Sequence, residues 1–462
     1  MRYIENDRVK VGIDLRVGGA VTFLTDRDNG GENMINSFDW GRQIQLSFYS
    51  GPKPYIGPNG EQPVPHWAAL GWNPIQSGDA GGNGSKVTHF AYEGNNAMRV
   101  RCLPMQWPLT SGVAGDCEFD CLYTLEGNVL TLRATIFVNR PDTTQYEACL
   151  QEMPALYTNG AWYKYVAYIG DKPFQNEPIT VLVDRQDGRG WPCREFAATE
   201  RWSALLDDHG KGIGVYQPDA LTMRGGFHGG DACKGHGSAT SNQTGYIGPA
   251  ARQILDHNIT WGYETAFVLG TVEEIREYAR RRESRRGAPA WTFTDSRHGW
   301  YYGGGAKDTG WPIRDGLDIT HPAGGKLIGP ETFLPVTADS ILEIEAAFDA
   351  AAAPGAPDAA PDAPHDDATV TVVVQPFGPS DMTDWLAWST AEHSMEAERL
   401  ARANTFPTAP AHNIPLTVRR DGTSRVHRVG LGEVAKDYTA VKQLSLTFNT
   451  PGTARVKRIE LK

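Results

Sequence analysis

The chain has 462 residues, a formal net charge of -11 at pH 7, and 51 glycines, 30 prolines and 13 tryptophans. An acidic chain without a polybasic run argues against nucleic acid and anionic membranes as partners, and no stretch approaches the ~18 apolar residues of a membrane span. Six cysteines in a chain of this length do not make a disulfide scaffold. The many turn-forming and aromatic residues favour a large all-β protein of two or three domains.

The N-terminal sequence MRYIENDRVKVGIDL has no apolar h-region and no small-residue cleavage site. We therefore expect a cytoplasmic protein, or a secreted one whose leader has been removed. Apolar and polar residues alternate from Val9 to Leu15, which predicts a strand that ends at a Gly18–Gly19 turn. Residues 86–139 contain four further strand candidates, with a hairpin at Glu126–Asn128.

Segment 43–79 combines several prolines with tryptophan, tyrosine, histidine and neutral amides. Proline removes backbone donors and restricts the unfolded chain, so a long loop of this composition can be ordered. Flat aromatic faces beside amides suit a sugar, which has apolar C–H faces and a rim of hydroxyls. We expect this segment to be a wall or lid of a sugar-binding cleft. The alternative is a lid that packs on its own sheet without contacting a ligand.

Residues 195–216 are predicted to be two strands joined by a turn at Asp207–Gly210, and residues 259–270 a further strand. A helix should follow, because Thr271 can cap its start while acidic residues occupy its first turn and Arg280–Arg282 its end. We place the domain boundary between residues 285 and 291. Regularly spaced strands over 291–462 predict a β-sandwich, interrupted by a mobile Ala/Pro/Asp-rich loop at 350–367 and a short helix at 385–404.

Several motifs carry a resemblance to known proteins: TFLTDRDNGGENMIN, QEMPALYTNG, TERWSALLDDHGKGIGVYQP and WGYETAFVLGTVEEIREYA. Through them, residues 1–285 resemble the galactose mutarotase-like group, the antiparallel supersandwich of sugar epimerases, several glycoside hydrolases and some polysaccharide lyases. Residues 291–462, through RRDGTSRVHRVGL, LSLTF and RIELK, resemble the jelly-roll modules of carbohydrate-active enzymes. The resemblance implies an all-β protein that acts on or binds sugars, and it spans several chemistries.

Two glutamates are the leading catalytic candidates. Glu152, in QEMPALY, would lie in an apolar setting with Tyr157, Trp162 and Tyr163, as a general acid requires. Strand alternation puts Glu200 and Trp202 on one face, which we expect to be concave, with Arg201 opposite. The structural alternatives are a glutamate that binds a loop backbone for Glu152, and an ion pair with another arginine for Glu200.

His228 and Asp79 are the substitute candidates. The glycines around His228 let the backbone approach a ligand closely, and its imidazole could serve as an acid or base. His228, Asp231, Cys233 and His236 match no standard zinc spacing, so we expect no metal and no cofactor. The alternative is a surface loop with solvated histidines.

The remaining predictions concern binding. The expected substrate contacts are Arg42, Gln43, Gln45, Tyr49, His66, Trp67, Trp72, Asn73, Gln76, Tyr157 and Trp202. The aromatic segment 298–312 is expected to pack between domains, and could instead line a second sugar surface.

The favoured function is a glycoside hydrolase that cleaves an oligo- or polysaccharide with paired carboxylates, Glu152 and Glu200. Two alternatives stay open: a polysaccharide lyase acting on a uronate-containing glycan with a Tyr or His base, and a non-catalytic glycan-binding protein. Mutarotase-type enzymes, with a Glu base and a His acid, draw on the same residue types.

Overall fold

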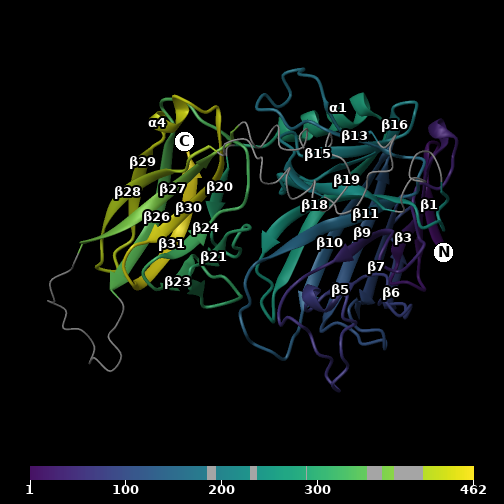
Figure 1. The fold of residues 1–462 in the computed structure, drawn as a ribbon, viewed down its shortest axis with the longest axis horizontal. Helices are drawn as coiled ribbons and strands as arrows, with labels where there is room; N and C mark the ends of the chain where they lie inside the picture. Colours follow the sequence, from purple (N-terminus) through teal and green to yellow (C-terminus); the bar gives the residue numbers. More distant parts are fainter. Residues whose placement is uncertain (185–193, 229–236, 288, 351–366, 379–408) are drawn as a thin grey trace. The chain divides into compact units, whose positions relative to one another are not determined.

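The structure is a computed structural model, and it describes residues 1–184, 194–228, 237–287, 289–350, 367–378 and 409–462. The chain divides into two compact units (Figure 1). Of the described residues, 1–251 and 257–285 form the first unit, and 252–256 together with those from 286 onward form the second. The predicted helix at 385–404 and residues 351–366 of the predicted loop lie outside the described residues.

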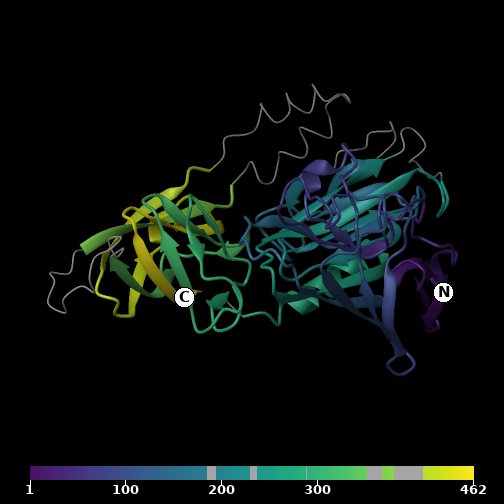
Figure 2. The ribbon, with the colours of Figure 1, turned by 90° about the horizontal axis from the view of Figure 1, so that it is seen from below.

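The first sheet of the first unit is antiparallel, and its edge strand β1 puts the N-terminus at the margin of this unit (Figures 1 and 2). Among the described residues its order is β1 (Arg2–Glu5), β2 (Val9–Asp14), β3 (Ala20–Asp26), β4 (Ile44–Ser47), β11 (Cys149–Thr158), β18 (Thr244–Gln253), β17 (Thr222–His228) and β14 (Arg194–Ala197), with β5 (Pro74–Ile75) and β8 (Met105–Gln106) attached beside β4.

The second sheet contains strands predicted for residues 86–139 and 259–270, and the part of the predicted stretch 195–216 that begins at Trp202; the start of that stretch instead belongs to β14 of the first sheet. Its order is β13 (Thr180–Asp184), β12 (Lys164–Ala167), β15 (Trp202–Leu206), β16 (Lys211–Tyr216), β19 (Thr260–Thr271), β10 (Val129–Val138), β9 (Cys117–Glu126), β7 (Ala97–Leu103) and β6 (Lys86–Tyr92). The predicted hairpin at 126–128 joins β9 to β10, whose residues pair from Glu126–Val129 to Cys117–Val138.

The two sheets pack face to face. Phe48, which follows β4, lies 5.1 Å from Phe119 of β9 between ring centroids, in an edge-to-face contact. Gly225 of β17 faces Tyr165 of β12 so closely that a Cβ there would lie 2.2 Å from the tyrosine ring. Alternating residues of the first sheet are therefore buried between the layers, and their neighbours point to its opposite face.

Helix α1 (Val272–Glu283) begins as the sequence predicts. Thr271 caps it, and Glu274 completes a capping box by accepting from the Thr271 backbone. The helix lies beside β15 and β16 (Figure 1), where its Ile275 and Ala279 pack against Trp202 and other residues of β15. This contact covers the outer side of the second sheet at β15.

The second unit is a β-sandwich, as predicted. One sheet is ordered β22 (Lys307–Asp308), β23 (Leu317–His321), β31 (Gly452–Leu461), β26 (Ile341–Ala350) and β29 (Arg425–Gly430), with β20 (Ala290–Thr292) on β31. The other is ordered β21 (Tyr301–Gly303), β24 (Gly325–Ile328), β30 (Ala440–Phe448), β27 (Asp367–Pro376) and β28 (His412–Arg419), with β25 (Leu334–Pro335) on β30.

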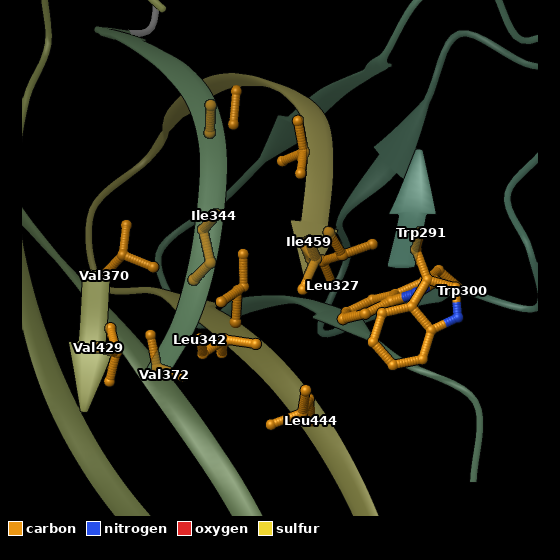
Figure 3. Packing of buried hydrophobic residues seen from close by; sticks show 14 of the residues in the cluster. Trp291, Trp300, Leu327, Leu342, Ile344, Val370, Val372, Val429, Leu444 and Ile459 are labelled. Atoms are coloured by element: carbon orange, nitrogen blue, oxygen red, sulfur yellow. The ribbon is translucent and has the colours of Figure 1, made fainter. Parts of the chain in front are cut away.

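A single apolar core fills this sandwich (Figure 3). Ile344 of β26 and Leu327 of β24 come from opposite sheets and both have no exposed surface. Trp291 and Trp300 close one end of the core, with ring centroids 5.4 Å apart.

The described residues also contain short helical segments. A short helix, α4 (Gly432–Ala435), precedes β30, and 3-10 turns occur at Arg27–Asn29 and Ala68–Leu70 of the first unit. No helix among the described residues is long and apolar enough to cross a membrane.

Candidate active site

Polar side chains gather on the face of the first sheet that is turned away from the second sheet, called the outer face below. On β4, Ile44 and Leu46 are fully buried between the layers, so Gln45 and Ser47 lie on the outer face. Glu152 of β11 pairs directly with Ser47 and shares that face. The strand order then continues to β18 and β17, so side chains of four neighbouring strands meet there.

Glu152 is 8% exposed, and each of its carboxylate oxygens accepts a hydrogen bond from a tyrosine. The Tyr246 hydroxyl donates to Oε1 over 2.5 Å, and the Tyr49 hydroxyl donates to Oε2 over 3.1 Å. Tyr49 in turn accepts from Ser47 Oγ over 3.0 Å. The expected neighbour Tyr163 instead donates to Asp208. The carboxylate is therefore held in one orientation by hydroxyl groups, as a proton-transfer group requires.

Tyr246 reaches Glu152 because the next outer-face position of its strand is a glycine. A Cβ at Gly248 would lie 2.3 Å from Tyr246 Oη and 2.9 Å from its Cζ. The tyrosine therefore lies along β18 over Gly248, with its hydroxyl directed at β11. Its ring also contacts Tyr157, with centroids 4.9 Å apart. Tyr246 is absent from the sequence-based candidates, since nothing in TGYIGPAARQ distinguishes it from a core tyrosine.

The local environment shifts the acidity of two groups on this face. Burial, followed by the nearby charge of Glu152, raises the pKa of Tyr49 well above its ordinary value of 10.0, so this hydroxyl remains a donor. His228 lies at the exposed end of β17, where partial desolvation, followed by the positive charge of Arg42, lowers the pKa of its imidazole below 6.5. A neutral His228 can donate a hydrogen bond from one ring nitrogen and accept a proton on the other.

Two further charged residues of the outer face were missed by the sequence analysis. Arg224 lies on β17, two residues before Gly226 and four before His228, and its Cγ is 3.6 Å from the Cβ position of Gly248. Glu195 of β14 pairs directly with Arg224, so it occupies the same face one strand further out. Neither follows a recognisable motif; their placement depends on strand order and register.

Glu200 lies elsewhere, on the side of the second sheet that α1 covers. Arg276 of α1 donates to both of its oxygens, over 2.6 and 2.8 Å, and Trp202 Nε1 and the Phe174 backbone donate as well. Glu200 and Trp202 have no exposed surface. The expected concave setting of these two residues is therefore wrong, and the alternative of an ion pair with another arginine describes Glu200. Arg201 pairs with Glu283 instead.

Asp79 organises a loop. One carboxylate oxygen accepts from the backbones of Gly81 and Asn83, both over 2.9 Å, and the other accepts from the backbone of Gly112 over 2.8 Å. The Asn83 side chain adds further contacts, and Asp79 is 1% exposed. The carboxylate of Asp79 therefore satisfies backbone N–H groups of this loop, which is a structural role.

Segment 43–79 is only partly a loop, because its ends form β4 and β5. Trp72, Asn73 and Gln76 are fully buried, and Gln76 donates to the Gly18 carbonyl and to Tyr123 inside the first unit. Gln43 and Gln45 accept from Ser77. These amides stabilise the junction of β4 with β5. They have almost no surface exposed to a substrate, although they were predicted to contact one.

Arg42 is also buried, whereas His66 and Trp67 lie closer to solvent. Arg42 is buried beneath its loop and donates to the carbonyl and side-chain oxygens of Asn242 over 2.9 and 2.8 Å. His66 is exposed and its ring lies 4.3 Å from that of Trp67, which in turn contacts Trp107 at 5.8 Å. His66 and Trp67 therefore remain available as aromatic contacts for a ligand.

The aromatic segment 298–312 belongs to the core of the second unit. Trp300 is 1% exposed within that core, and Asp308 binds the buried Arg297 through both oxygens, over 2.6 and 2.8 Å. Within the described residues, no three His, Cys, Asp or Glu side chains are arranged to hold a metal ion. Asp231, Cys233 and His236 lie outside those residues.

Comparisons with known proteins give similarities to solved structures. A galactose mutarotase-like protein from Lactobacillus casei is 14% identical, with a TM-score of 0.33 over 58% of this chain and 99% of its own. A GH36 alpha-galactosidase from Geobacillus stearothermophilus is 10% identical, with a TM-score of 0.32 over 63% of this chain and 44% of its own. No protein-family model matches, and no curated protein matches. The function proposed below rests on this chain's own residues.

Proposed function

We propose that this chain is a carbohydrate-active enzyme that moves protons to and from a bound sugar through Glu152. The observation that carries the proposal is the setting of Glu152: a nearly buried carboxylate, oriented by Tyr49 and Tyr246, on a sheet face that also presents Arg224 and His228. Tyr157, whose ring contacts Tyr246, supplies an apolar face for a sugar, and Arg224 and His228 supply hydrogen-bonding groups.

Mutarotase-type chemistry fits this set of residues best. It requires one carboxylate base that takes the proton of the anomeric hydroxyl and one acid that protonates the ring oxygen, so that the ring opens and closes again. Glu152 is our candidate for the first role. His228, on the same face, is our candidate for the second, for which its imidazole must carry a proton. Arg224 would bind a hydroxyl or carboxylate substituent of the sugar.

Glycoside hydrolysis is the second candidate, and Glu195 is the observation that favours it. The two carboxyl groups of a glycosidase lie about 5 to 9.5 Å apart. Glu200 and Asp79 are engaged elsewhere, whereas Glu195 shares the outer face with Glu152. Three strand spacings separate β11 from β14, about 14 Å between backbones, so both side chains would have to lean inward over the sheet.

Product analysis on a panel of aldoses, glycosides and uronate-containing glycans tests the proposal. We expect the protein to accelerate the conversion of a pure anomer, followed by polarimetry or NMR, and Glu152→Gln to abolish the acceleration. New reducing ends, lost in both Glu152→Gln and Glu195→Gln, would assign hydrolysis instead. An ultraviolet-absorbing unsaturated product would assign a lyase. Binding without any product would leave a glycan-binding protein and reject an enzyme.

A further inference from the structure

A series of hydrogen-bonded polar groups, called the hydrogen-bond series below, leads to Glu152 from inside the first unit. Asn73 Nδ2 lies 3.3 Å from Ser47 Oγ, which lies 3.0 Å from Tyr49 Oη, which lies 3.1 Å from Glu152 Oε2. Asn73 and Ser47 have almost no exposed surface. Each link is a hydrogen bond between neutral groups until the last, which ends on a carboxylate.

The donor and acceptor roles in this hydrogen-bond series are fixed at its inner end, by Asn73. Asn73 Nδ2 also lies 2.8 Å from the carbonyl oxygen of Phe48. Turning the amide over would place two oxygens against each other at that distance, so the nitrogen must face the carbonyl and Ser47. Asn73 can only donate to Ser47.

The role of Asn73 then determines the donor and the acceptor of each following hydrogen bond in the series. Ser47 Oγ accepts from Asn73, and its single proton goes to Tyr49 Oη. Tyr49 therefore directs its own proton to Glu152 Oε2. On the other side, Tyr246 donates to Oε1. A proton on Oε2 would force Tyr49 to turn its proton toward Ser47, and the Ser47 proton would then lose its acceptor because Asn73 offers none.

We propose that Asn73 and Ser47 are positioning residues that fix Glu152 as the base of the site, with the acid supplied by another group. This inference rests on the proposed function, since it assigns a role to the carboxylate on which that function depends. It differs from the sequence-based expectation, in which Glu152 would be the general acid. It also gives a role to the amide that is fully buried at position 73.

The test uses Ser47→Ala and Ser47→Thr in the full chain. We expect Ser47→Ala to lower kcat by about 10- to 100-fold with KM little changed, because Tyr49 loses the group that orients its proton. Ser47→Thr keeps the hydroxyl and should restore most of kcat. Ser85→Ala is the matched control. Ser85 is also buried and also forms two hydrogen bonds, over 3.2 and 3.0 Å, but it takes no part in the hydrogen-bond series that leads to Glu152.

A second readout is independent of turnover. The infrared difference spectrum between wild type and Glu152→Gln isolates the carboxylate bands of Glu152, and Ser47→Ala should shift these bands whereas Ser85→Ala should not. If Ser47→Ala does not fold, Tyr49→Phe should give the same loss of kcat. Full activity of Glu152→Gln would reject the proposed function itself. Loss of activity in Glu152→Gln, with Ser47→Ala matching Ser85→Ala in kcat and bands, would reject only this inference.

Discussion

Arg276 donates two hydrogen bonds to Glu200, over 2.6 and 2.8 Å, from a helix that covers the outer side of the second sheet. This pair links α1 to the turn before β15, and the Trp202 indole completes the enclosure of the carboxylate. Glu200 and Glu152 look alike in the sequence, each beside aromatic residues in a predicted strand. Their partners separate them: an arginine for Glu200, and two hydroxyl groups for Glu152.

Glu200→Gln should destabilise the first unit by about 3 kcal/mol, because the largely buried guanidinium of Arg276 would lose its counterion. Thermal unfolding followed by circular dichroism measures the loss. Glu152→Gln is the matched comparison, with a small expected change in the unfolding midpoint and a large loss of turnover. An unchanged midpoint in Glu200→Gln would contradict the structural role assigned to this pair.

Gly248→Ala should reduce turnover by about 10-fold or more without unfolding the protein. The added methyl group would meet Tyr246 Oη at 2.3 Å, so the tyrosine must swing away from Glu152 and release its oxygen. Gly430→Ala is the control, since nothing lies within 4 Å of the corresponding Cβ position. Equal activity in the two variants would mean that the Tyr246 hydrogen bond does not matter for turnover.

Asp79→Asn should act on stability and leave catalysis nearly intact. The amide nitrogen would replace one of the acceptors that close the 79–83 turn and hold Gly112, at a cost of about 2 kcal/mol. Turnover measured well below the unfolding temperature should remain close to wild type. A loss of kcat comparable to that of Glu152→Gln would return Asp79 to the list of chemical candidates.

The stability of the second unit should fall as the solution is acidified through pH 6.5. Burial lowers the pKa of His321, whose ring stacks on Phe448 at 3.9 Å. The unfolded chain therefore binds a proton on this residue at a higher pH than the folded one, and stability is lost as pH falls below 6.5. His321→Phe keeps the stacking and removes the titration. Its unfolding midpoint should drop less than that of wild type between about pH 7.5 and about pH 5.5.

Strands and the main helix were accessible from the sequence because their signals are local. Period-2 alternation identified β9 and β10, and the cap, acidic first turn and basic end identified α1. The sandwich of the second unit followed from the spacing of its strands. These features need only neighbouring residues, so tertiary contacts did not have to be known.

The candidate site was only partly accessible, because it depends on pairing between distant segments. Glu152 and Tyr49 were named from composition, but Tyr246 and Arg224 join them only through the order β4–β11–β18–β17. Glu200 was assigned to the wrong surface because alternation tells which residues share a face and not which face is covered. Here α1 covers it, which the sequence of β15 alone cannot reveal.

Residues 252–256, which include the last two residues of β18, group with the second unit, although the rest of β18 and all of β19 belong to the first. Asp256 there accepts from Arg297 over 2.6 Å, opposite Asp308. A protein cut near residue 285 would therefore leave the second unit with a buried arginine that lacks one of its two counterions. Fusion or domain-swap experiments must therefore keep residues 252–256 together with the sandwich of the second unit.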